Sequence, residues 1–267
     1  MSRMNALRIP LFQVDAFAER TFAGNPAAVC PLESWLDDEL LRAVAQENNL
    51  SETAFLVGGA GRYELRWFTP VAEVDLCGHA TLASGFVVLE YLEPERSEVS
   101  FETRSGTLAV RRAGARLALD LPRRIPRPFT LPAGYAEALG ARPLETLRAE
   151  CPLLVLDSEA AVRALRPDMG RLAALEPHGA IVTAPADDPR VDFVSRFFAP
   201  ALGIPEDPVT GSVHSELAGY WSERLGRTAL EARQLSARGG ALGCTVEETR
   251  VRLVGSVAPY LRGTIEL

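Results

Sequence analysis

Residues 66–82 have the sequence RWFTPVAEVDLCGHATL, and this stretch decides the fold because the chain contains a second version of it. The second version, residues 196–214, has the sequence RFFAPALGIPEDPVTGSVH. In both, an aromatic strand end is followed by a proline, a short acidic loop, and a Gly-His or Gly-Ser pair that begins an apolar helix. The loop of the second copy is three residues longer. Two copies predict two similar halves related by a pseudo-twofold axis, which would bring the two helix starts face to face.

The length supports the same division. The chain has 267 residues, which exceeds the usual size of one domain. Residues 122–132 contain four prolines and are typical of a connection between domains. We therefore assign residues 1–121 to an N-terminal half and residues 122–267 to a C-terminal half. A strand near residues 258–267 could return to the first half.

The absence of lysine excludes several kinds of enzyme. All 28 basic side chains are arginines, so neither the Schiff base of a pyridoxal phosphate enzyme nor the phosphate contact of a P-loop is available. No Gly-x-Gly-x-x-Gly motif follows a predicted strand, which argues against a Rossmann dinucleotide site. We therefore expect chemistry without an organic cofactor.

Charge and cysteine usage exclude further partners. The net charge is −7 and no basic run exceeds two arginines, which argues against nucleic acid. The four cysteines form no Cys-x-x-Cys pair and the three histidines lack ligand spacing, so we expect reduced thiols and no metal site. No apolar run approaches the ~20 residues that span a bilayer, and residues 1–6 (MSRMNA) lack the apolar core of a signal peptide. A cytoplasmic protein is expected.

Hydrophobic patterns predict a similar order of elements in both halves. A helix with Ser34 as N-cap should continue to about Gln46. The helix after His79 has no charged residue until Glu90, so we expect it to be buried inside a strongly curled sheet. The strands predicted for this half are residues 8–17, 27–30, 53–57, 63–68, 99–102, 107–111 and 117–121.

The second half should repeat this order. A helix at residues 169–175 precedes strands at 180–183 and 192–198, and a second helix at 212–225 follows. The remaining strands are expected at residues 230–235, 245–248, 251–254 and 260–265. The inward stripe of the second helix should consist of Val213, Leu217, Tyr220 and Leu225.

The two helix starts could carry out chemistry. A helix N-terminus presents unpaired N–H groups and a positive dipole end, so it attracts carboxylates and developing negative charge. Gly78 and Gly211 let the backbone approach a ligand closely. Two such starts across a cleft would hold a carboxylate and stabilise an enolate-like intermediate beside it. The acid and base candidates near them are His79, Glu47 and Asp75 in the first half and Asp207 and Ser212 in the second.

Each candidate also has a purely structural interpretation. His79 and Ser212 could be N-caps, and Glu47 could be a solvated carboxylate at a helix end. Asp207 could form a turn, and Cys77 could be a small buried hydrophobe. The recurrence of polar residues at matching positions in both copies favours the functional interpretation.

Four segments resemble the PhzF-like isomerase family of phenazine biosynthesis. They are residues 24–29 (GNPAAV), 47–53 (ENNLSET), 68–81 (FTP followed by LCGHAT) and 206–212 (EDPVTGS). The resemblance implies the diaminopimelate epimerase-like fold, an α+β architecture of two pseudo-twofold-related halves. Each half is a curled, mostly antiparallel sheet around a central helix, with the active site between the halves. It also implies a cofactor-free proton shift or epimerisation of a small carboxylic acid, commonly in a homodimer.

The resemblance also implies roles for individual residues. The catalytic residues would be Glu47 as general acid and base, with His79, Asp207 and Ser212. Substrate contacts would come from Asn25, Ser51, Cys77, Gly78, Thr210 and Gly211. Relatives with two-cysteine racemase chemistry place a thiol on each side of the substrate, whereas here Cys77 has Thr210 as its counterpart. Two alternatives stay open: a racemase in which Cys77 acts with another base, and a binding protein that holds a carboxylate without catalysis.

Overall fold

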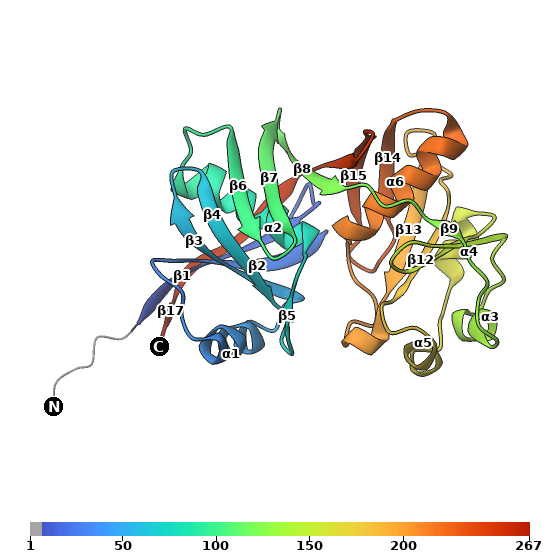
Figure 1. Ribbon diagram of the computed structural model, residues 1–267, viewed down its shortest axis with the longest axis horizontal. Coiled ribbons are helices and arrows are strands. Elements are labelled where there is room, and N and C mark those ends of the chain that lie inside the picture. The colour runs from blue at the N-terminus through green and yellow to red at the C-terminus, as the bar shows by residue number, and fades with distance from the viewer. Residues whose placement is uncertain (1–6) are drawn as a thin grey trace. The chain divides into compact units, whose positions relative to one another are not determined.

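The computed structural model describes residues 7–267, so residues 1–6, where no signal peptide is expected, lie outside the described residues. Contacts divide the chain into two compact units (Figure 1). The first unit contains the chain up to Leu119 together with Gly255–Leu267, and the second is Asp120–Val254. None of the helices described between residues 7 and 267 has the length and apolar character needed to cross a membrane.

The first unit is a curled sheet with two helices. Its helices are α1 (Asp38–Asn48) and α2 (Gly78–Val87), the latter extended by a π-helical turn, η1 (Val88–Leu92). Its strands are β1 (Arg8–Ala16), β2 (Asn25–Leu32), β3 (Glu52–Gly59), β4 (Arg62–Phe68), β5 (Glu73–Val74), β6 (Glu98–Thr103), β7 (Gly106–Ala113), β8 (Arg116–Pro122) and β17 (Val257–Glu266). The last strand, β17, pairs antiparallel with β1 and so belongs to the first unit, which the sequence analysis gave as a possibility.

The second unit contains the remaining elements. Its helices are α3 (Tyr135–Leu139), α4 (Glu159–Ala164), α5 (Met169–Leu175), the 3-10 turn η2 (Pro200–Leu202) and α6 (Gly211–Leu225). Its strands are β9 (Arg127–Pro128), β10 (Glu145–Arg148), β11 (Pro152–Val155), β12 (Ala180–Pro185), β13 (Phe193–Phe198), β14 (Ala229–Gln234), β15 (Gly240–Val246) and β16 (Arg250–Gly255).

The two units repeat each other strand by strand. In the first, β2 pairs in parallel with β3, β3 antiparallel with β4, β4 in parallel with β6, and β6, β7 and β8 follow as antiparallel neighbours. In the second, β11 to β16 show the same series of parallel and antiparallel pairings. The duplicated sequence therefore encodes a duplicated, mostly antiparallel curled sheet, as expected.

A central helix fills the concave side of each sheet. In α2 every residue except Phe86 is buried, and the helix contacts β1, β2, β3 and β7 (Figure 1). A side chain at Gly85 would place its Cβ 2.4 Å from Val110 of β7, so glycine allows this close approach. The prediction of a helix buried on all sides is confirmed.

The inward stripe of α6 differs from the predicted one. Val213, Leu217 and Trp221 are buried, whereas Leu225 is 42% exposed and Tyr220 is only partly buried. The buried residues follow a spacing of four along the helix, which continues one face to Trp221. Leu225 continues this spacing, but it is the last residue of α6 and lies exposed at the end of the helix.

The start of α1 also differs from the prediction. The helix begins at Asp38 with Asp37 as N-cap, so Ser34 does not cap it. Trp35 and Leu36 instead pack, partly buried, against the hydrophobic core beneath α1. Because these two residues pack in an irregular segment, the helix begins about one turn later than the sequence pattern predicts.

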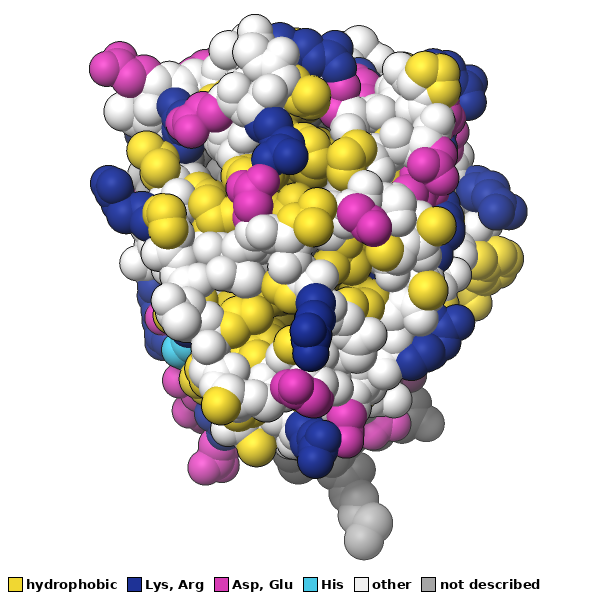
Figure 2. Space-filling view, turned by 90° about the vertical axis from the view of Figure 1, so that its right-hand side faces the viewer, with side chains coloured by type: hydrophobic (Ala, Val, Ile, Leu, Met, Phe, Trp, Pro, Cys, Tyr) yellow, Lys and Arg dark blue, Asp and Glu magenta, His cyan; other side chains and the backbone are white. Residues whose placement is uncertain are grey.

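The surface carries charges of both signs. On the face shown in Figure 2, arginines and carboxylates are interspersed with patches of hydrophobic side chains. This mixture agrees with a chain in which 28 arginines accompany 35 acidic residues.

Candidate active site

The two helix starts have the same backbone form. Cys77 precedes α2 and Thr210 precedes α6, both with extended backbone and without a side-chain capping hydrogen bond. His79 and Ser212 are each the second residue of their helix, so neither is an N-cap. The structural interpretation of these two residues as caps is therefore wrong.

At the start of α2 the side chains form a polar cluster, which we call the histidine network: Asn25, Ser51, Glu52, Cys77 and His79. Nδ1 of His79 lies 3.1 Å from Nδ2 of Asn25 and 3.5 Å from Sγ of Cys77. Nε2 lies 3.1 Å from Oε2 of Glu52. The Ser51 hydroxyl donates to the Asn25 side-chain oxygen over 3.4 Å. The structure thus brings together four predicted site residues and adds Glu52.

The two ionisable side chains of this network that form an ion pair, His79 and Glu52, are buried. Only 4% of His79 and 8% of Glu52 is exposed. Burial opposes the charged imidazole, but the Cys77 sulfur and the Glu52 carboxylate raise the pKa of His79 well above 6.5. We attribute this direction to Glu52, because the thiol carries no charge at neutral pH: burial, together with Glu52, raises the pKa of Cys77 to about 11. Glu52 thus favours the protonated form of His79, while burial favours the neutral form of the Cys77 thiol.

The charged pair is electrostatic in character. Oε2 of Glu52 and Nε2 of His79 lie 3.1 Å apart, and neither atom has another hydrogen-bond partner among residues 7–267. An imidazolium at a helix N-terminus is opposed by the helix dipole, so Glu52 compensates both burial and dipole.

Three atoms of the network are of types that bind metals. The ligand atoms of Glu52, Cys77 and His79 lie within 4.8 Å of one another. Both ring nitrogens of His79 are already in contact with other side chains. We therefore interpret this cluster as a polar network around His79, and the expectation that the protein needs no metal stays a prediction.

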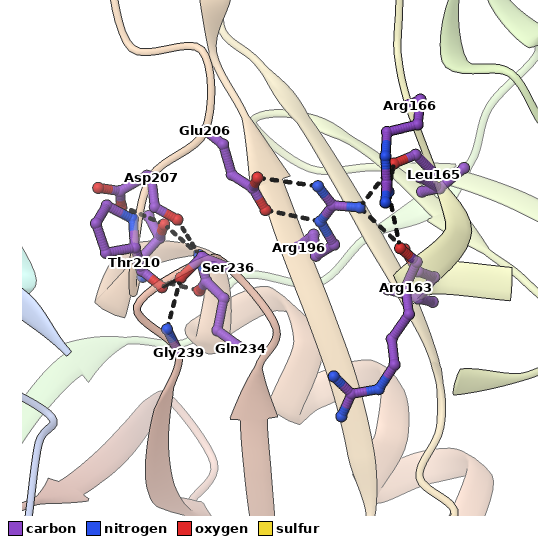
Figure 3. A network of polar contacts seen from close by, with 12 residues as sticks. Arg163, Leu165, Arg166, Arg196, Glu206, Asp207, Thr210, Gln234, Ser236 and Gly239 are labelled. Carbon is purple, nitrogen blue, oxygen red and sulfur yellow. Dashed lines mark hydrogen bonds and ion pairs between the residues drawn. The ribbon is translucent and has the colours of Figure 1, made fainter. Parts of the chain in front are cut away.

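At the start of α6 the side chains of Asp207, Thr210 and Gln234 take the corresponding place (Figure 3). The Thr210 hydroxyl donates to the carboxylate of Asp207, a residue that is almost fully buried. Gln234, at the end of β14, donates from Nε2 to the Asp207 carbonyl over 2.8 Å and accepts from the Thr210 amide over 2.9 Å. Sequence reasoning missed Gln234, because nothing in its local sequence connects it to a loop 24 residues away.

The other polar residues of α6 differ in character. Ser212 is partly buried, and its hydroxyl makes no hydrogen bond with residues 7–267, which leaves it available to a ligand. His214 is buried with Nδ1 2.7 Å from the Thr210 carbonyl oxygen and Nε2 3.4 Å from the Ser195 hydroxyl. Burial lowers the pKa of His214 to about 4, so this histidine is neutral and supports the loop.

Glu47 lies outside both clusters. It is exposed in the last turn of α1, and its carboxylate forms neither a hydrogen bond nor an ion pair with residues 7–267. Such a carboxylate is free to meet a substrate, but no side chain of the described chain orients it. Its role as general acid and base therefore stays a prediction.

Comparisons with known proteins decide the family. A model of the phenazine biosynthesis-like protein family matches residues 14–128 and 136–263. The chain belongs to this family. An uncharacterized isomerase of Pseudomonas aeruginosa is 53% identical to this family member over 261 residues, which cover 98% of this chain and 100% of that protein.

Solved structures support the same assignment. The crystal structure of a PhzF-family phenazine biosynthesis protein from Enterococcus faecalis is 45% identical, with a TM-score of 0.93, and the match covers 98% of this chain and 100% of that one. A predicted epimerase from Pseudomonas aeruginosa is 26% identical with a TM-score of 0.74, over 97% and 99% of the two chains. This PhzF-like chain is thus an enzyme of the isomerase class with the epimerase-like fold that its sequence implied.

Proposed function

We propose that this PhzF-like enzyme moves a proton at a carbon next to a carboxylate or conjugated system in a small carboxylic acid. The observation that carries the proposal is the buried pair of His79 and Glu52 at the first helix start. A protonated histidine at a helix N-terminus is suited to stabilise negative charge as it develops. In the proposal no organic cofactor or metal takes part.

The residues of both helix starts would serve one substrate. The N–H groups of the first turns, next to Gly78 and Gly211, would bind the carboxylate. A protonated His79 would stabilise the enolate-like intermediate by the charge that it places at the start of α2, and the free hydroxyl of Ser212 would donate a hydrogen bond to it. Asp207, held by Thr210 and Gln234, would complete the second helix start as a proton acceptor or donor.

Glu47 would move the proton. As a carboxylate it would remove the hydrogen from the activated carbon and return it at a different position or on the other face. The high pKa of the Cys77 thiol disfavours the racemase alternative, because a neutral thiol in contact with His79 is a poor base at neutral pH.

Solvent-hydrogen exchange tests this function. The protein is incubated in D2O with a panel of small carboxylic acids, and NMR follows the loss of the hydrogen signal next to the carboxylate. Exchange in at least one acid is expected, and Glu47→Gln should reduce its rate by about 10³-fold while ligand-induced thermal stabilisation persists. Glu39→Gln, another exposed glutamate of α1, is the matched control and should leave the rate unchanged.

Two outcomes would contradict the proposal. Exchange at the wild-type rate in Glu47→Gln would remove Glu47 from the mechanism. Thermal stabilisation by an acid that shows no exchange with the wild-type protein would favour the non-catalytic carboxylate-binding alternative.

We also propose a cytoplasmic homodimer. Six consecutive residues of β17, at positions 259–264, are exposed although neighbouring side chains of a strand point to opposite faces. Tyr260 is 51% and Leu261 42% exposed, and an apolar pair of this kind fits a protein interface. Light scattering should give twice the chain mass of 28.9 kDa, and a mass of one chain would contradict the dimer.

A further inference from the structure

Arg196 of β13 forms a buried fork with Glu206 (Figure 3). Its Nε and Nη2 donate to the two carboxylate oxygens of Glu206 over 2.7 and 2.9 Å. Its Nη1 donates to the carbonyl oxygens of Val162 and Leu165 over 3.1 and 3.0 Å. The guanidinium carbon lies 4.7 Å from the ring centroid of Phe198. All three guanidinium nitrogens are therefore engaged in one fixed geometry.

The first unit contains an equivalent bidentate pair of an arginine and a glutamate. Arg66 of β4 donates from Nε and Nη2 to the two carboxylate oxygens of Glu73, over 2.8 Å each. Its Nη1 lies 2.9 Å from Asp38 Oδ1 at the start of α1. Its guanidinium carbon lies 5.1 Å from the ring centroid of Phe68. In both units the arginine thus stands two residues before a phenylalanine that it covers.

Each fork closes the loop in front of a helix start. Glu206 is the residue directly before Asp207, whose amide donates to the Phe197 carbonyl over 3.0 Å. The loop from β13 to Asp207 is therefore tied to the strand by a side-chain fork at Arg196 and by a backbone bond at the next residue. In the first unit Glu73 precedes Cys77 by four residues in the corresponding loop.

We propose that the two forks position the candidate catalytic groups. The fork of Arg196 and Glu206 holds Asp207 and Thr210 in place, and the fork of Arg66 and Glu73 does the same for the loop that leads to His79. None of these four residues needs to touch the substrate, so they are positioning residues. The inference rests on the proposed function for its catalytic meaning.

The geometry of the fork requires arginine. Lysine has one ammonium group, which cannot bind both carboxylate oxygens side by side and also reach two carbonyls of another segment. The pair lies in a largely buried place, with side-chain exposures of 11% for Arg196 and 22% for Glu206. A fork between Arg190 and Asp188 has similar distances of 3.0 and 2.8 Å, but the arginine side chain is 82% exposed. It provides a matched control.

The test compares three variants of the full chain. Arg196→Lys keeps the charge but loses the fork, and Arg196→Met combined with Glu206→Gln removes both charges together, so that no buried charge is left unpaired. Arg190→Met breaks the exposed control fork. Amide hydrogen exchange by mass spectrometry follows the peptide that covers residues 207–213, and this readout needs no substrate.

The positioning role predicts a local effect. In both Arg196 variants the amide hydrogens of residues 207–213 should exchange about tenfold faster than in the wild type. Amide exchange in the rest of the unit should stay unchanged, and Arg190→Met should exchange at the wild-type rate throughout. With an acid that exchanges its hydrogen, kcat should fall about 10²-fold with KM nearly unchanged, because a small displacement of catalytic groups suffices for such a loss. Should no acid be a substrate, the proposed function fails while the amide exchange still tests the fork.

Three results would overturn the proposal. Unchanged exchange of residues 207–213 in either Arg196 variant would show that the fork does not hold the loop. Wild-type kcat and protection in Arg196→Lys would show that charge, and not the fork, is what matters. Global unfolding of both variants would show that the pair supports the whole unit and not the loop.

Discussion

The two helix starts share a backbone and differ in chemistry. Each begins with glycine after an extended N-cap residue without a side-chain cap. At the first, His79 and Glu52 form a buried ion pair, whereas at the second Asp207 and Thr210 form a hydrogen-bonded loop with Gln234. The duplication has therefore kept the anion-attracting backbone in both units, while the side chains differ: the first unit has a histidine paired with a carboxylate, and the second has a carboxylate held by a hydroxyl group.

This difference predicts an unequal division of labour. A preorganised positive charge stabilises a developing anion more strongly than a neutral hydroxyl does. We therefore expect the first helix start to supply most of the stabilisation of the intermediate, and the second to hold and orient the substrate.

In the comparison of the two helix starts, the largest expected effect is that of His79→Gln. Loss of the imidazolium should lower the rate of solvent-hydrogen exchange about 10³-fold, whereas Ser212→Ala, its counterpart in the second unit, should cost about tenfold. Both rates are measured in D2O with the same acid, and circular dichroism checks folding. Equal losses in the two variants would contradict the unequal division between the helix starts.

A smaller effect concerns stability in acid, where the histidines of the two units act in opposite directions. The pKa of His214 is lowered to about 4, so its unfolded form binds a proton below about pH 6.5 and the folded form does not. The free energy of unfolding should therefore fall by up to about 3 kcal/mol between pH 6.5 and 4 through this residue. Urea unfolding at a series of pH values should show that the free energy of unfolding falls more steeply with decreasing pH in the wild type than in His214→Gln. An equal dependence on pH in the two proteins would contradict this role of His214.

The repeat made most of the fold predictable. The strand order, the buried α2 and the position of α6 follow from two copies of one pattern and from a helix without charges. The short helices α3 and α4, and the strands β10 and β11, were not predicted. Helices of five or six residues are shorter than the window over which helical periodicity can be recognised.

The candidate site was predicted only in part, because its contacts join distant segments. Asn25, Ser51, Cys77 and His79 lie in one polar cluster, but their roles in catalysis stay predictions. The contact between His79 and Glu52 arises from the packing of β3 beside α2, which no local sequence pattern reports. Both forks have a signal in the sequence, since an arginine stands two residues before a phenylalanine in each copy. The three-residue insertion shifts the second glutamate and hides the match.

The most direct test of the account is a titration of the histidine side chains by NMR, which is simple in a chain with three histidines. We predict that the His79 imidazole stays protonated well above pH 6.5, and that Glu52→Gln lowers its pKa while leaving His214 unchanged. If the pKa of His79 in the wild type were 6.5 or lower, or if it did not change in Glu52→Gln, the first helix start would not carry a charged histidine. Either result would contradict the proposed chemistry.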